Sequence, residues 1–177
     1  EKYANVSGVG VGGVKRLLRK AGEQRGAKAV RDTAIVRVFY DLALRRSEVC
    51  ALDLSDVNLE MQALLVLGKG RTQKTSMSFP AATREALSAW IDARGTEPGA
   101  LFYSLEHRLV GKKRRLTSRG IYEVIRTLGA KTGQTLHPHQ LRHTSITEAV
   151  KSSVDCGISL DEVMQFSRHK DVSTMLI

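Results

Sequence analysis

The chain has 177 residues, which is enough for one good hydrophobic core and short for two domains. Its 28 lysines and arginines outweigh 18 acidic residues and give a formal net charge of +10, which favours attraction to polyanions such as nucleic acid. No apolar run approaches the roughly 20 residues of a membrane span and no signal-peptide pattern opens the chain, so we expect a cytoplasmic protein with no membrane partner.

Hydrophobic periodicity predicts a mixed α/β fold that is mainly α-helical and forms one domain over residues 1–177. A small antiparallel β-sheet is expected near residues 57–79. The helices are expected at residues 14–24, 27–44, 82–94, 118–131, 138–151 and 160–167.

The helix expected at 27–44 is apolar and runs directly into Arg45 and Arg46. An arginine at the end of a buried helix can be desolvated. Glu48 follows Arg45 by three residues, so it either orients that guanidinium or forms an exposed helix pair worth roughly 0.2–0.5 kcal/mol. Taken alone, this spacing favours the exposed pair.

Residues 64–80 are predicted to form a strand, a glycine-flanked basic turn and a second strand. Lys69 lies at the tip of this hairpin, between Gly68 and Gly70. Exposed turns often carry lysine, so the hairpin alone does not mark Lys69 as functional.

A basic run at residues 112–115 precedes a helix that Thr117 can cap. A charge run is usually a solvated face, but in a chain this basic we expect it to follow DNA phosphates. The residues expected to contact DNA are Arg71, Lys74, Lys112, Lys113, Arg114, Arg115 and Arg119.

The segment His137–His143 places an imidazole and a guanidinium together at the start of a helix. Pro138 favours the first helical position, so His139 and Arg142 fall about one turn apart on one face. Unpaired amides at that helix end favour anions. The pattern outlines a phosphate site, although a packing or surface role fits these two residues equally well.

The ordered residues Arg45, Lys69, His139, Arg142 and His169 resemble the catalytic domain of the tyrosine recombinases, the phage-integrase and Xer-type enzymes, over about residues 12–177. Residues 44–48 resemble the first arginine box, 68–70 the hairpin lysine, 138–143 the second box, and 168–169 a turn that usually reads Gly-His. The resemblance implies the tyrosine recombinase catalytic-domain fold. It also implies that a DNA-clamping N-terminal domain lies outside the given chain.

The resemblance implies site-specific DNA recombination or integration through a 3′-phosphotyrosyl intermediate. In that chemistry Arg45 and Arg142 bind the phosphate oxygens, Lys69 protonates the leaving 5′ oxygen, and His139 assists the tyrosine. His169 donates a hydrogen bond to the phosphate. Glu48 and His143 are supporting residues, and neither a metal nor another cofactor is required.

Two departures from the family pattern affect these expectations. The nucleophilic tyrosine is expected just after Ile177, so the chain as given should bind double-stranded DNA better than it cuts it. Arg168 replaces the glycine of the turn, where glycine tolerates positive φ and arginine does not. The full-length protein is expected to form a tetramer on DNA. The alternatives are a non-catalytic DNA-binding relative and a type IB topoisomerase-like enzyme.

Overall fold

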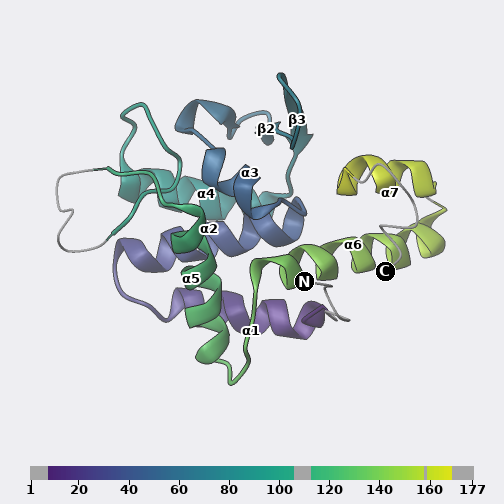
Figure 1. Cartoon of the computed structure of the whole chain (residues 1–177), viewed down its shortest axis with the longest axis horizontal. Coiled ribbons are helices and arrows are strands. Elements are labelled where there is room, and N and C mark those ends of the chain that lie inside the picture. Colours follow the sequence, from purple (N-terminus) through teal and green to yellow (C-terminus); the bar gives the residue numbers. More distant parts are fainter. Residues whose placement is uncertain (1–7, 106–112, 158, 169–177) are drawn as a thin grey trace.

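The computed structural model describes residues 8–105, 113–157 and 159–168. Within these ranges the chain is mostly helical with one small antiparallel sheet, as the periodicity predicts (Figure 1). In chain order the elements are α1 (Gly10–Gly22), α2 (Ala27–Asp41), α3 (Arg46–Ala51), the short 3-10 helix η1 (Leu54–Asp56), β1 (Val57–Asn58), β2 (Ala63–Leu67), β3 (Lys74–Ser78), α4 (Ala81–Arg94), α5 (Ser118–Ala130), α6 (Pro138–Cys156) and α7 (Leu160–Ser167).

Helix α2 is the centre of the main core and runs through the middle of the body in Figure 1. Its consecutive residues Ala34, Ile35 and Val36 are all fully buried although successive helical residues point about 100° apart, which is typical of a helix packed on most sides. Helices α1, α4, α5 and α6 contact it. Trp90 of α4 completes this core and donates an indole hydrogen bond of 2.9 Å to the Leu101 carbonyl.

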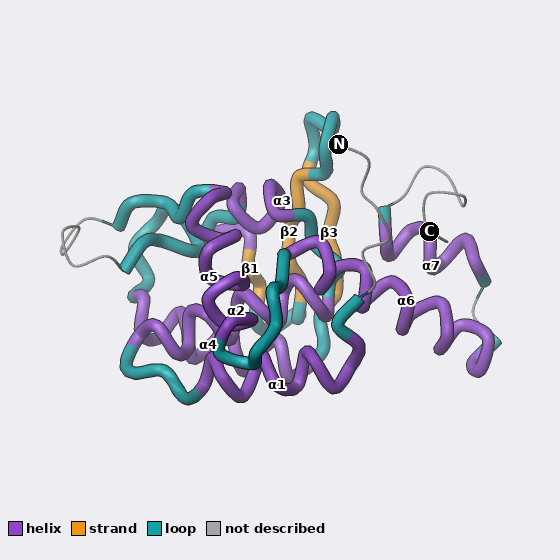
Figure 2. Tube along the Cα trace, turned by 60° about the horizontal axis from the view of Figure 1, so that its bottom comes forward, coloured by secondary structure: helices purple, strands orange, loops and turns teal. Residues whose placement is uncertain are grey.

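The sheet has the strand order β1-β2-β3, with both pairs antiparallel. Leu64 and Val66 of β2 point into the core, whereas Leu65 and Leu67 face outward, so the strand alternates as a half-buried strand should. The turn at 68–73 joins β2 to β3 and projects beyond the helices (Figure 2). The predicted hairpin is therefore confirmed.

Helices α6 and α7 form an arm that leaves the main body (Figure 1). Helix α6 packs on α2 and ends at Cys156, and the left-handed backbone of the next residue, Gly157, suits a helix C-terminus. Helix α7 lies along the distal half of α6. Ile146 of α6 and Val163 of α7 bury each other in a small second core together with Ala43, which comes from the segment after α2.

The C-terminal end predicted for the helix at 27–44 is wrong. Helix α2 stops at Asp41, and residues 42–45 form a buried turn before α3. Ala43 adopts a left-handed backbone with φ of 46°. That conformation is unfavourable for alanine, so tertiary contacts to this turn must stabilise it. Within the described residues, no helix is long and apolar enough to cross a membrane.

Candidate active site

The start of α6 carries the predicted His139 and Arg142. Pro138 occupies the first helical turn, and the Gln140 side chain accepts a 2.8 Å hydrogen bond from the His137 amide, which anchors this helix end. Arg142 is buried, with 3% of its surface exposed. His139 lies nearer solvent, and partial burial together with the charges of Arg142 and His143 lowers its pKa below the usual 6.5. This shift of the pKa favours the neutral imidazole.

Arg45 is the residue that caps α3, because the chain turns before it and begins a new helix after it. Glu48 accepts two hydrogen bonds from this residue, one from the Arg45 amide at 2.8 Å and one from the guanidinium Nη1 at 3.0 Å. Glu48 is only 2% exposed. The prediction of an exposed Arg45–Glu48 pair is therefore wrong, because α3 is a separate short helix that directs the Glu48 carboxylate inward. The alternative, in which Glu48 orients the Arg45 guanidinium, agrees with these contacts.

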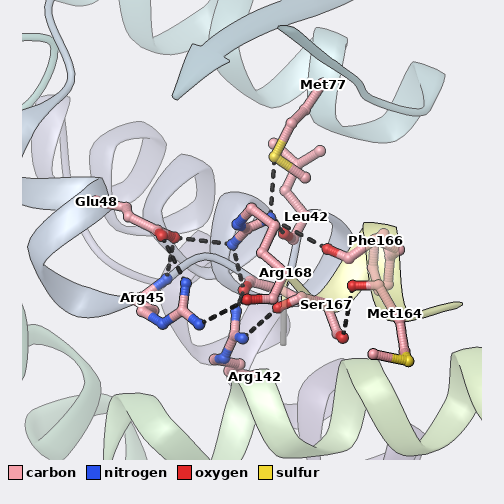
Figure 3. A network of polar contacts seen from close by, with 10 residues as sticks. Leu42, Arg45, Glu48, Met77, Arg142, Met164, Phe166, Ser167 and Arg168 are labelled. Atoms are coloured by element: carbon pink, nitrogen blue, oxygen red, sulfur yellow. Dashed lines mark hydrogen bonds and ion pairs between the residues drawn. The ribbon is translucent and has the colours of Figure 1, made fainter. Parts of the chain in front are cut away.

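Arg45 and Arg142 converge on one dipeptide at the end of α7 (Figure 3). Arg45 Nη2 donates to the Arg168 carbonyl at 3.1 Å, and Arg142 Nη2 donates to the Ser167 carbonyl. Arg142 Nη1 also donates to the carbonyl of Ala43. One guanidinium from the residue before α3 and one from α6 therefore hold the carbonyl oxygens of two consecutive residues.

Arg168 places a third guanidinium in this site. Its backbone is left-handed, with φ of 53°, so the turn keeps the conformation that glycine would favour even though an arginine occupies it. Its side chain is 15% exposed and donates to Glu48 Oε2 at 2.8 Å. The other groups that accept hydrogen bonds from it are the Leu42, Ala43 and Phe166 carbonyls and the Met77 sulfur.

Among the described residues of this network, the guanidiniums of Arg45, Arg142 and Arg168 outnumber the one carboxylate, that of Glu48, which pairs with Arg45 and Arg168 (Figure 3). Burial, followed by the charges of Arg45 and Arg168, lowers the pKa of Arg142 to about 9. Burial also lowers the pKa of Arg168. A cationic, poorly solvated cluster of this kind favours an anion that accepts several hydrogen bonds, as a phosphodiester does.

Lys69 does not belong to this network. It is exposed on the 68–73 turn and makes no hydrogen bond or ion pair with any residue that the structure describes. His143 lies one turn beyond His139, where its Nδ1 is 3.4 Å from the Thr147 hydroxyl. The predicted sites His169 and Lys112 lie outside the described residues.

The residues predicted to contact DNA fall into two groups. Lys74 pairs with buried Asp56 at 2.5 Å, and Lys113 donates to the Arg94 carbonyl at 2.6 Å, so both already hold protein partners. Arg115 donates to two backbone carbonyls at 2.9 Å and pairs with Asp53. Of the remaining members, Arg71 and Arg114 are exposed, and the exposed Arg119 pairs with Glu123 at 2.6 Å and lies over the Tyr122 ring.

Sequence reasoning missed Arg168 as a member of the site. The available signal was an arginine at a turn position that favours positive φ, because a residue kept there against its backbone preference often serves a purpose. That signal marked the backbone as unusual but did not say where the side chain points.

Comparisons with known proteins identify the family. The model of the phage integrase family matches residues 13–177. The chain is 31% identical over 181 residues to a tyrosine recombinase of Synechocystis sp., covering all of this chain and 56% of that relative. It is 36% identical over 154 residues to tyrosine recombinase XerC of Pseudomonas aeruginosa, covering 84% of this chain and 47% of XerC. The chain therefore belongs to the phage integrase family.

Solved structures agree with this assignment. The crystal structure of XerA recombinase superposes with a TM-score of 0.79 at 26% identity, over 96% of this chain and 59% of that one. XerH bound to its difH substrate has a TM-score of 0.76 at 18% identity, over 96% of this chain and 49% of that one. The fold is the tyrosine recombinase catalytic-domain fold, and the chain spans about half the length of the curated relatives named here.

Proposed function

We propose that the protein to which this chain belongs performs site-specific DNA recombination or integration, cutting and rejoining DNA through a 3′-phosphotyrosyl intermediate. In this proposal residues 1–177 form its catalytic domain. The observation that carries the proposal is the convergence of Arg45 and Arg142 on the carbonyl oxygens of two consecutive residues (Figure 3). A scissile phosphodiester carries two non-bridging oxygens on one phosphorus atom, and these could accept hydrogen bonds from the same two guanidiniums.

The proposed reaction uses these groups in one displacement. The phenolic oxygen of a tyrosine, expected just after Ile177, forms a bond to phosphorus while the bond to the 5′ oxygen breaks. Arg45 and Arg142 stabilise the charge that develops on the non-bridging oxygens. His139, whose lowered pKa favours its neutral form, accepts the phenolic proton. Lys69 gives a proton to the leaving 5′ oxygen, which requires the hairpin tip to meet the DNA, and His169 donates a hydrogen bond to the phosphate.

Attack by a 5′ hydroxyl of another strand reverses the displacement and rejoins the DNA, so the phosphodiester energy is conserved. The partner of this chemistry is double-stranded DNA. Two structural neighbours support that partner, since XerH and the Tn1549 integrase were each solved in complex with DNA. We further propose a cytoplasmic protein that forms a tetramer on DNA through segments outside this chain.

The test is covalent capture with the full-length protein. A duplex site is first selected by that protein from a random-sequence pool, then nicked so that cleavage releases a short strand and cannot be reversed. The proposal predicts an adduct that survives denaturation and disappears when the tyrosine after Ile177 is changed to phenylalanine. Intact binding without an adduct contradicts the proposal and favours a non-catalytic DNA-binding protein. Supercoil relaxation without recombinants favours a topoisomerase-like enzyme instead.

A further inference from the structure

Arg168 occupies a backbone position that disfavours its own side chain. It follows the last residue of α7, and its left-handed φ of 53° and ψ of 33° would suit a glycine better. Ala43, whose carbonyl accepts a 2.9 Å hydrogen bond from Arg168, also has a positive φ, of 46°. Two such residues in contact mark a site where the surrounding structure imposes the backbone.

The side chain of Arg168 connects three separate parts of the chain. Its guanidinium donates to the Leu42 carbonyl at 3.2 Å and to the Ala43 carbonyl at 2.9 Å, both in the turn between α2 and α3. It also contacts the sulfur of Met77 on β3 at 3.0 Å. Arg168 therefore fastens the end of α7 to the turn that leads into Arg45 (Figure 3).

The Glu48 carboxylate links the guanidinium of Arg168 to that of Arg45. One carboxylate oxygen of Glu48 accepts from Arg168 at 2.8 Å, and the other accepts from the Arg45 guanidinium at 3.0 Å. Arg45 in turn donates to the main-chain carbonyl of Arg168 at 3.1 Å. The three residues form a closed ring of contacts. A shift of the Arg168 guanidinium would therefore move the Glu48 carboxylate that holds the Arg45 guanidinium in place.

We propose that Arg168 is a positioning residue for DNA cleavage: it holds the Glu48 carboxylate and the α2–α3 turn so that Arg45 faces the scissile phosphate. The inference rests on the proposed function and deepens it, because it assigns a role to a guanidinium that does not itself need to touch DNA. Arg168 also anchors the end of α7, and His169 is the next residue in the sequence.

The test compares Arg168→Gly, Arg168→Gln and Arg168→Lys in the full-length protein. Glycine suits the left-handed backbone, so this variant keeps the turn while it removes the guanidinium. Single-turnover cleavage of the selected, nicked duplex is measured at saturating protein, well below the melting temperature of each variant. Lys20→Gln is the matched control, because Lys20 pairs with Glu23 in an exposed contact on α1.

We expect Arg168→Gly and Arg168→Gln to lower the cleavage rate by roughly 10- to 100-fold, the scale on which misplaced catalytic groups act. Their affinity for the duplex should stay within about twofold of the wild type, since phosphate contacts are spread over many residues. Lysine should recover part of the rate because it can still pair with Glu48. The Lys20→Gln variant should cleave at the wild-type rate.

A double-mutant cycle with Glu48→Gln separates positioning from direct action. If Arg168 acts through Glu48, Arg168→Gln lowers the rate much less in the Glu48→Gln background than in the wild type. Wild-type cleavage by Arg168→Gly, or independent effects of the two changes, would overturn the inference. Failure of the wild-type protein itself to form an adduct would instead count against the proposed function, so the two failures are distinguishable.

Discussion

The buried carboxylate of Glu48 provides the most quantitative prediction. Its side chain is 1% exposed, and it accepts hydrogen bonds of 2.8, 3.0 and 2.8 Å from the Arg45 amide, the Arg45 guanidinium and the Arg168 guanidinium. Glu48→Gln preserves the shape and one acceptor oxygen but leaves the surrounding guanidiniums without a counter-charge. The change should destabilise the fold, because breaking a buried ion pair from one side leaves charges uncompensated.

The size of that loss follows from the geometry. Removing one partner of a buried pair costs about 3–5 kcal/mol, and the retained acceptor of glutamine places this variant near the lower end. A chain of this length shifts its melting temperature by roughly 2–4 °C for each kcal/mol, so the expected drop is roughly 6–12 °C.

Thermal unfolding of this chain, followed by circular dichroism or calorimetry, measures the drop directly. The control is Glu23→Gln, which changes a half-exposed carboxylate that pairs with Lys20 on α1 and should leave the melting temperature almost unchanged. Equal melting temperatures for the two variants would refute the reasoning, because Glu48 would then behave as a surface residue.

Two further predictions concern proton transfer and DNA contact. The pKa of His139 is lowered from 6.5 and its neutral form is the proposed base, so cleavage should be constant between about pH 7 and 8, where Arg142 with its pKa of about 9 is still charged. The rate should fall as the pH drops through the pKa of His139. His139→Gln should lose this fall, and a rate that rises on acidification would contradict the role. Arg114 and Arg115 are neighbours with opposite expected effects. Arg115→Ala should cost about 1–3 kcal/mol of stability, because its guanidinium donates to the Cys50 and Leu52 carbonyls. Arg114 is exposed, so Arg114→Ala should keep the melting temperature. It should instead reduce the slope of log affinity against log salt concentration by about 0.9 for each lost phosphate contact. Thermal melts and binding titrations across salt concentrations check this pair, and the reverse pattern would contradict it.

Local sequence patterns account for most of the fold. The start of α6 follows from Pro138, and the hairpin follows from an apolar run, a glycine-flanked basic turn and a second strand. These features depend on neighbours in the sequence, which pattern rules describe well. The position of His139 and Arg142 together at the start of α6 was predictable for the same reason.

The ring of Arg45, Glu48 and Arg168 was not predictable in this way. Arg45 and the Arg168 carbonyl are 123 positions apart, and Arg168 and Leu42 are 126 apart. Helix α2 ends early because the left-handed Ala43 is stabilised by guanidiniums from α6 and from the end of α7. Propensity alone favours a continuous helix there, and tertiary hydrogen bonds overrule it.

In the proposed reaction Arg142 acts on the charge of the scissile phosphate. The most direct measurement is single-turnover cleavage by the full-length wild type and Arg142→Ala, each with a normal scissile phosphodiester and with an uncharged methylphosphonate at that position. Comparing the two substrates within one variant cancels any loss of folded protein. Arg142→Ala should lose roughly 100-fold or more in rate on the phosphodiester, as for removal of an oxyanion donor, and much less on the methylphosphonate. An equal loss on both substrates would contradict this role of Arg142.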